Sequence, residues 1–392
     1  MAMLGASSAQ DQEQDQLLTN LVYRYYSNEQ LAPHLEQEKL ALILKQIKAI
    51  RAFAQEYMPL VQISDEEITI LSMSIFTPHQ TPEKGIVDTD RNYIEVKRAL
   101  SRFYCISLLQ QGSEGYAAFV ENQPKDNEFI PTLQKEEFAE LAKKYQSLDA
   151  LTLDTLKVAT LISSVPLSLE AHKRADKIFG KNNYLVDTVE FAAKVFEDMD
   201  VARKVYPQVD YLLQRYPSDA QRALIKQNLQ SAFAHHRHYR HMLYTEGSTN
   251  MFATLIAEVQ QGKLSKEAYD FWVLYWNTNI TGFQGNVQPK GSYYLTSNTH
   301  RAMCALESVL EALFDDNSLS ASNLLSAYLT QRAGFLGLGD ANNTGVKLNI
   351  KEQEFLAHIG AMMRFYNKEQ GQLLSSSYLV IKDIIQDLRK DF

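Results

Sequence analysis

Apolar side chains recur at the spacing of an α-helix along most of this sequence. Between Gln37 and Met58, for example, they fall close to every third or fourth position. Local start and stop signals divide this pattern into segments, such as the Ser218 and Gln221 pair typical of a capping box and Gly180 after a helical run. The sequence therefore predicts an all-α fold, a multi-helix globular bundle arranged in one domain or in two helical subdomains.

One stretch interrupts the helical pattern clearly enough to suggest a boundary. Residues 111–131 contain two glycines and two prolines, and we expect a long loop or linker there, with a short strand at residues 116–120. We therefore expect a smaller N-terminal helical subdomain over residues 1–125 and a larger C-terminal helical domain over residues 126–392. Further along, Pro207 should interrupt the helical pattern of residues 201–216.

Composition limits the classes of partner and the compartment. The net charge of -8 argues against binding to a nucleic-acid backbone, which requires clustered Lys and Arg. Cys105 and Cys304 both lie in helical patterns that should bury them, and no CxxC pair suggests a thiolate metal site. We see neither a signal peptide nor a run of about 18 apolar residues, so we expect no membrane span and a cytoplasmic protein.

The strongest local anomaly is a histidine-rich segment, since four of the nine histidines fall within residues 235–241. We predict that one helix runs without interruption from Ser218 to about Tyr244. On such a helix His235, His238 and His241 lie away from the apolar stripe, either as a solvated polar face or as ligands of a divalent metal. No HExxH pattern accompanies them.

Three other residues of the same segment continue the apolar stripe and should point inward. We predict that His236, with Tyr239 beside it, acts as a catalytic acid or base, and that Arg240 binds an anionic group of the substrate. Burying these groups is costly unless they are paired. The alternative is therefore a satisfied core network with a purely structural role.

Residues 277–301 form a second polar stretch, which follows an aromatic helix end. Its glycines allow the backbone to approach a ligand closely, and the helix that should begin near Thr296 or Asn298 offers an N-terminus suited to anions. Neither a Walker loop nor a Rossmann fingerprint is present. The alternative is an ordered connector packed by its own aromatic residues. The substrate-binding residues predicted here are Asn279, Gln284, Lys290, His300 and Arg301.

Together these features lead to two hypotheses about function. The first is an enzyme, a hydrolase or transferase, that acts on a phosphorylated or otherwise small anionic substrate at a cleft lined by His and Arg. The second is a non-catalytic effector or adaptor that binds a protein partner. In its acidic, Gln-, Asn- and Tyr-rich composition the chain resembles the helical effector proteins that intracellular bacteria deliver by type IV secretion. That resemblance implies delivery into a host cell without a cleaved signal peptide.

Overall fold

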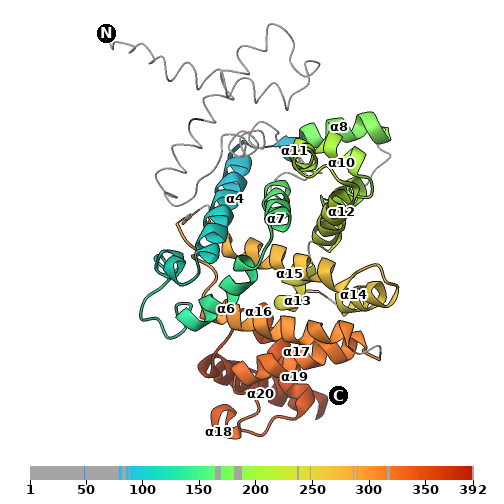
Figure 1. The fold of residues 1–392 in the computed structure, drawn as a ribbon. Coiled ribbons are helices and arrows are strands. Elements are labelled where there is room, and N and C mark those ends of the chain that lie inside the picture. Colours follow the sequence, from blue (N-terminus) through green and yellow to red (C-terminus); the bar gives the residue numbers. More distant parts are fainter. Residues whose placement is uncertain are drawn as a thin grey trace. The chain divides into compact units, whose positions relative to one another are not determined.

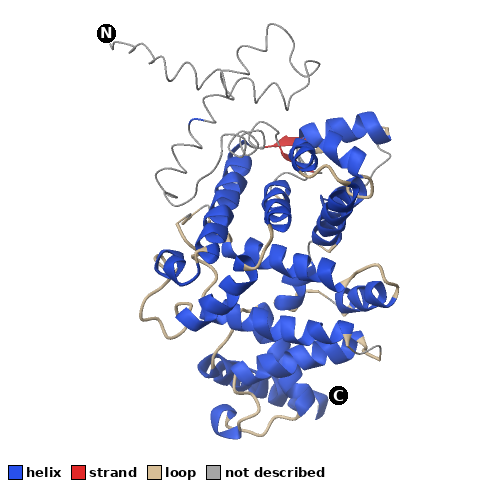
Figure 2. Ribbon diagram, in the orientation of Figure 1, coloured by secondary structure: helices blue, strands red, loops and turns tan. Residues whose placement is uncertain are grey.

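A computed structural model describes Lys48 and residues 79–81, 85–87, 89–163, 169–180, 188–235, 238–247, 249–285, 287–288, 290–315 and 318–390. Helices make up most of these residues, which confirms the all-α fold (Figure 2). Within the described part, the exception is an antiparallel hairpin of β1 (His79–Thr81) and β2 (Gly85–Val87). Apart from Lys48, the helix predicted between Gln37 and Met58 lies outside the described residues.

The chain folds into two compact units that alternate along the sequence. The first unit comprises the residues up to Asn122, Phe138–Ala234 and Asn277–Tyr294, and the second comprises Gln123–Glu137, His235–Trp276 and Leu295–Phe392. This division differs from the single boundary expected near residue 125, because the chain returns to the first unit twice.

The elements of the first half of the chain are mostly short helices. Their bounds are α4 (Thr89–Gln110), η2 (Gly112–Gly115), α5 (Tyr116–Phe119), α6 (Lys135–Gln146), α7 (Ala150–Ile162), α8 (Leu169–Phe179), α9 (Thr188–Val195), α10 (Met199–Val205), α11 (Pro207–Arg215) and α12 (Asp219–Ala234).

In the first unit, α7 packs against α4, α11 and α12, and α12 also contacts α9 (Figure 1). The prediction at Pro207 is confirmed, because α10 ends at Val205 and Pro207 occupies the first turn of α11. The expected strand at residues 116–120 is wrong, because Tyr116–Phe119 forms the helix α5. Burial explains this. The Phe119 ring packs on the Phe138 ring with 5.1 Å between centroids, and a helical turn allows this contact.

The second half of the chain contains longer helices. Their bounds are α13 (His238–Leu243), α14 (Asn250–Gln260), α15 (Lys266–Thr281), α16 (Ser297–Leu310), η3 (Glu311–Phe314), α17 (Ala321–Phe335), α18 (Ala341–Thr344), α19 (Ile350–Met362) and α20 (Lys368–Lys390).

In the second unit, α17 packs between neighbours on several sides, contacting α14, α16 and α19, and α19 in turn contacts α20 (Figure 1). A cluster of aliphatic side chains that includes Leu336 and Leu356 fills the space between α17, α19 and α20. At Gly371 the backbone of α20 comes so close to the carbonyl group of Leu336 that a Cβ atom would collide with it. This close approach fixes the first turn of α20 against the end of α17.

Among the described residues, no helix combines the length and the apolar character needed to cross a membrane.

Candidate anion-binding site

Helix α19 of the second unit ends in a turn that positions two arginines. Arg364 adopts a left-handed conformation (φ 58°), and the amide of Phe365 donates to the carbonyl of Gly360 at 2.8 Å, as in a Schellman motif. Two carbonyl groups after this turn accept hydrogen bonds from side chains of other helices. Arg332 of α17 donates from Nη2 to the Phe365 oxygen at 2.9 Å, and Arg301 of α16 donates from Nη2 to the Tyr366 oxygen at 2.7 Å.

Aromatic rings bring these two guanidinium groups together. The guanidinium carbon of Arg301 lies 4.3 Å from the ring centroid of Phe335, and that of Arg332 lies 5.7 Å from the same centroid. Arg332 also lies 4.6 Å from the centroid of the Tyr366 ring. Such cation–π contacts stabilise a charge only in part, by about 0.5–2 kcal/mol each.

Arg332 is a charged side chain with no solvent exposure at all (0%). Its Nε and Nη1 atoms have no hydrogen-bond acceptor within the described part of the chain. Because guanidinium remains charged in proteins, burial cannot be relieved by losing a proton. Arg332 is therefore a buried cation with unused donors.

The second guanidinium adds to this positive charge. Burial and then the charge of Arg332 lower the pKa of Arg301, while Glu137 acts in the opposite direction. Glu137 is held elsewhere, since its carboxylate accepts from the Ser297 hydroxyl at 2.7 Å and from the Gln134 amide at 2.8 Å. Arg301 is exposed to solvent, whereas Arg332 is fully buried.

A nearby phenol does not provide the missing negative charge. Burial raises the pKa of Tyr328 to about 12, while the charge of Arg332 and a side-chain hydrogen bond with it act in the opposite direction, so the phenol is neutral at physiological pH. Its hydroxyl donates to the carbonyl of Leu243. The two arginines thus form a site of net positive charge, and the sequence had predicted only Arg301 as one of its residues.

Arg332 was missed although a sequence signal existed. It lies four positions after Tyr328 and next to Ala333, both of which are buried along the same face of α17. A charged residue on an apolar stripe, as at Arg240, indicates a side chain that should point inward, and Arg332 on α17 fits the same pattern. Its proximity to Arg301 could not be found in this way, because it depends on how α16 and α17 pack.

His300 and Cys304 lie on α16 next to this pair. The Cys304 sulfur is 3.6 Å from Nε2 of His300 and 3.8 Å from Nδ1, so it contacts the ring without aligning with one nitrogen. Cys105 is buried as expected, but Cys304 is exposed, which corrects the prediction that both cysteines are buried. The alternation of helix faces explains this, because Cys304 lies on the same side of α16 as Arg301.

The histidine-rich segment does not form one uninterrupted helix. Helix α12 ends at Ala234 and α13 begins at His238, while His236 lies outside the described residues. The break changes which side chains face inward. His235 is buried at 4% exposure although it was expected to face outward, and Arg240 is exposed although it was expected to face inward. The geometric reason for Arg240 as an anion-binding residue is therefore lost.

The buried His235 instead forms a polar cluster with the half-buried His238 and with Glu258 of α14. Nε2 of His235 lies 2.5 Å from the Glu258 carboxylate, and the two imidazole rings are 5.0 Å apart between centroids. Burial, followed by the positive charge of His235, lowers the pKa of His238 to about 4. His241, on α13, is half-buried. In the described residues no group of three or more His, Cys, Asp or Glu side chains is arranged to hold a metal ion, so the metal hypothesis stays a prediction.

Tyr239 is buried as the sequence predicted, in a setting that keeps its phenol protonated. Its hydroxyl donates to Glu307 at 2.6 Å, and its ring stacks on Trp276 at 5.8 Å between centroids. Burial and the nearby Glu307 charge raise its pKa well above the usual range. At neutral pH the phenol keeps its proton, which favours a structural role.

The remaining predicted residues belong to the first unit. Helix α15 continues to Thr281, so Asn279 lies within a helix and not in a loop, and both polar atoms of its buried amide lack a hydrogen-bond partner among the described residues. Gln284 is exposed in a left-handed conformation (φ 62°). Lys290 is half-buried, and its carbonyl accepts from the Asn122 side chain at 2.9 Å. These residues do not converge on one another through any hydrogen bond.

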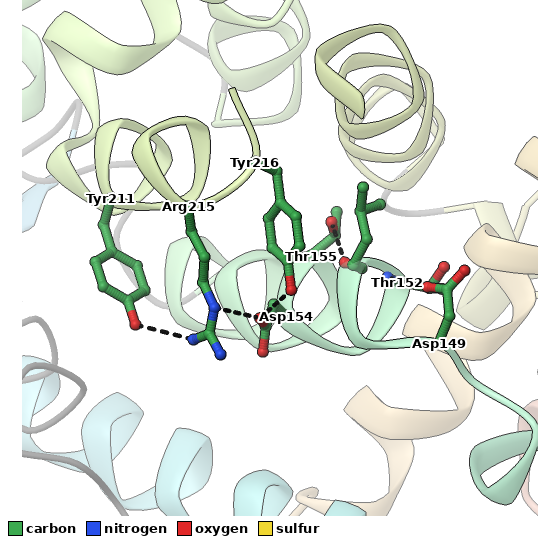
Figure 3. A network of polar contacts seen from close by, with 8 residues as sticks. Asp149, Thr152, Asp154, Thr155, Tyr211, Arg215 and Tyr216 are labelled. Atoms are coloured by element: carbon green, nitrogen blue, oxygen red, sulfur yellow. Dashed lines mark hydrogen bonds and ion pairs between the residues drawn. The ribbon is translucent and has the colours of Figure 1, made fainter. Parts of the chain in front are cut away.

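A polar network of the first unit shows how a carboxylate and a guanidinium are paired elsewhere (Figure 3). The Asp154 carboxylate of α7 accepts from the Tyr216 hydroxyl at 2.6 Å and pairs with Arg215 at 3.2 Å, and Arg215 also donates to Tyr211 (Figure 3). Burial and the bond to Asp154 raise the pKa of Tyr216 to about 12. The network fastens α11 to α7, whereas among the described residues no ion pair joins Arg301 or Arg332 to a carboxylate, although Glu137 is near enough to favour the charge of Arg301.

The chain matches no protein-family model, and searches of curated proteins and of solved structures find no match.

Proposed function

We propose that this protein binds an anionic ligand and that Arg301 and Arg332 hold its charged group. The observation that carries the proposal is Arg332, a fully buried guanidinium with two nitrogens that lack acceptors and with a second guanidinium beside it. Burying an uncompensated charge costs several kcal/mol. Glu137 offsets part of the charge of Arg301, and a bound anion would supply a countercharge to Arg332.

The two arginines suit different parts of this task. Arg301 is exposed and can contact a ligand from solvent, while Arg332 is buried and keeps two nitrogens without acceptors among the described residues. Guanidinium groups bind carboxylates and phosphates through paired, charge-assisted hydrogen bonds. Binding is therefore the part of the predicted function that the geometry supports. A hydrolase or transferase reaction, with His236 as its acid or base, stays a prediction.

The proposal is tested by measuring whether small anions stabilise the protein. At low ionic strength, sulfate, phosphate and acetate are titrated into the purified chain and the melting temperature is recorded. We expect at least one of them to raise it, and we expect Arg301→Gln and Arg332→Met to abolish the shift.

Arg240→Gln is the matched control, because it removes the same charge from an exposed position of the same unit. It should leave the shift intact. If no anion stabilises the wild-type chain, or if Arg240→Gln alone abolishes the effect, the proposal is wrong.

A second candidate function, binding of a protein partner, is favoured by an exposed apolar surface on α19 and α20. Val380 and Ile384 of α20 are 60% and 54% exposed, and Phe355 of α19 is 53% exposed. Val380 and Ile384 lie one helical turn apart on α20, and exposed apolar side chains that share a helix face mark interaction surfaces more often than single ones do. A photo-crosslinking residue at position 384 should capture one defined protein in cells, whereas one at the exposed Lys351 should not.

A further inference from the structure

We infer that the outward face of helix α20 binds a second copy of this chain, so that two α20 helices pack against each other in antiparallel orientation. The inference rests on the second candidate function, the binding of a protein partner, and names that partner. It is independent of the arginine pair. Three features of α20 carry it: the face used by the fold, the spacing of the exposed apolar residues and the charges beside them.

One face of α20 is fully used by its own fold. Gly371 lies against the end of α17, and Ser375 is completely buried. Further along, the Tyr378 hydroxyl and the Lys382 ammonium both donate to the same carboxylate oxygen of Glu352 on α19, at 3.1 Å and 2.8 Å. These four positions of α20 are spaced by four, three and four residues, so they lie on a single face of the helix.

The opposite face carries a second row of residues at the same spacing, here called the outer row. It consists of Leu373, Ser377, Val380 and Ile384. All four are exposed, and Leu373 is 59% exposed. At about 100° per residue, the outer row lies roughly 160° around the helix from the face that packs inward. A surface helix needs one such stripe, whereas two stripes are typical of a helix that packs between two neighbours.

The outer row is complementary to itself when two copies of α20 run in opposite directions. If Leu373 of one copy faces Ile384 of the other, then Ser377 faces Val380. A twofold axis repeats both contacts and gives four layers, each of which contains at least one aliphatic side chain. The exposed side chain of Ile381 lies beside these layers and widens the apolar surface.

Charges at the ends of the outer row favour the antiparallel orientation. In this register Glu369 of one copy lies beside Lys390 of the other, and Asp387 faces the amide group of Gln370. Lys390 also pairs with Asp387 of its own helix at 3.1 Å, so it lies between two carboxylates. A parallel pair would instead place each Asp387 against its own counterpart, and like charges repel.

Three further charged residues of α20 fit this pairing. Asp383 lies beside Ser376 of the other copy, Lys382 is paired with Glu352 of its own copy, and Lys368 lies close to the turn that follows α17. The whole helix carries four basic and three acidic side chains. Such a balance suits a protein partner better than an anionic membrane surface, which binds helices with a basic polar face.

The size of the outer row predicts weak and reversible association. Five side chains from each copy, counting Ile381, take part. An interface of this kind buries less than about 1,200 Å² in total, which is typical of transient complexes. We therefore expect a dissociation constant between about 1 and 100 μM.

The test measures the mass of the full chain by sedimentation equilibrium over concentrations from about 1 to 300 μM. We expect the mass to rise from that of one chain to that of two. Val380→Asp places a carboxylate in the middle of the outer row and should keep the chain monomeric throughout. Its melting temperature at low concentration should match the wild type, because position 380 is 60% exposed. Val287→Asp, the same exchange at a residue of the first unit that is 74% exposed, should leave the dimer intact.

A charge reversal tests the orientation. Glu369→Lys replaces two attractive contacts of the dimer by repulsive ones and should weaken it by about tenfold. Adding Lys390→Glu to the same chain should restore most of the affinity. If the double variant stays as weak as the single one, the antiparallel register is wrong.

Other results overturn the inference as a whole. A wild-type chain that stays monomeric up to the highest concentration has no such interface, and a Val380→Asp variant that still dimerises has its interface elsewhere. A monomer that sediments with vesicles of phosphatidylcholine and phosphatidylserine would assign the outer row to a membrane surface. If the crosslinking residue at position 384 captures a different protein, the second candidate function holds and the inference fails.

Discussion

At the scale of single residues, the contrast between Asp154 and Arg332 is the most informative. Both are charged and largely withdrawn from water, but Asp154 is paired with Arg215 and Tyr216, whereas Arg332 keeps two nitrogens without acceptors. A fold gains nothing from an unpaired buried charge. Such a residue is therefore better explained by a ligand than by stability.

This explanation predicts the effect of removing the charge. Arg332→Met keeps the side-chain length and removes the uncompensated cation, so the ligand-free protein should lose no more than about 1 kcal/mol of stability, or should become more stable. Urea denaturation without added anions measures this. A loss of roughly 3–5 kcal/mol would instead show that the bond to the Phe365 carbonyl and the ring contacts are structural.

His238 should make stability depend on pH. Burial, and then the charge of His235, lowers its pKa in the folded protein to about 4, whereas an unfolded histidine titrates near 6.5. Between these values the unfolded chain binds more protons, so stability should decrease as the pH falls from about 6.5 to about 4. Since His238 is only partly buried, we expect a loss of about 1–2 kcal/mol.

The His238→Gln variant tests this, because its stability should fall less over that pH range than the stability of the wild type. His358→Gln, on α19, removes a histidine that does not contribute to this shift and should keep the wild-type slope. A slope that is unchanged in His238→Gln assigns the pH dependence to other groups.

At the scale of helices, the sequence predicted boundaries well where the cause is local. Pro207 starts α11, Gly180 follows α8 with a positive φ of 83°, and the Ser218 hydroxyl accepts from the Gln221 amide at the start of α12. The sequence did not predict that the helix ends at His235. There the side chain pairs with Glu258, and the backbone carbonyl accepts from Trp272, so contacts distant in sequence outweigh the local pattern.

The candidate site shows the same limit. Arg301 was predicted, because it follows a glycine-rich loop near a helix start. Its neighbour Arg332 comes from α17, and the carbonyls that both arginines bind come from the turn after α19. No pattern along the chain specifies that three helices meet at this point, since their packing decides it.

The packing of α20 predicts opposite effects for the same substitution at two helical glycines. Replacing a helical glycine by alanine usually stabilises a protein by about 0.5–1 kcal/mol. Gly334 of α17 has open space around it and should follow this rule. At Gly371 of α20 a Cβ atom would collide with the Leu336 carbonyl, so Gly371→Ala should destabilise the protein by about 1–3 kcal/mol.

Thermal denaturation of the two variants side by side measures the difference, with Gly334→Ala as the matched control. A stabilising effect at both positions would show that α20 is not held against the end of α17.

At the scale of the whole molecule, the two units can be followed with separate signals. The chain has two tryptophans, Trp272 and Trp276, and both belong to the second unit. Their fluorescence therefore reports the unfolding of the unit that contains the arginine pair, whereas circular dichroism reports the helices of both units.

A ligand of the arginine pair should act first on the fluorescence transition. At a concentration of 100 times its dissociation constant, an anion that binds the pair should stabilise the native state by about 2.7 kcal/mol. We expect the tryptophan transition to move to a higher temperature by at least as much as the transition seen by circular dichroism. A shift confined to circular dichroism would place the binding site outside the second unit.

The alternation of the chain between units also has a consequence for biosynthesis. The first unit lacks residues 277–294 until late in translation, and the second needs segments that extend to the end of the chain. Neither unit can therefore be completed while the early segments emerge from the ribosome. The apolar side chains of helices such as α7 and α12 stay exposed until all of their packing partners have been synthesised. Chains that delay burial in this way depend on chaperones to prevent aggregation, so a truncated gene ending near residue 276 should yield insoluble product and not an isolated first unit.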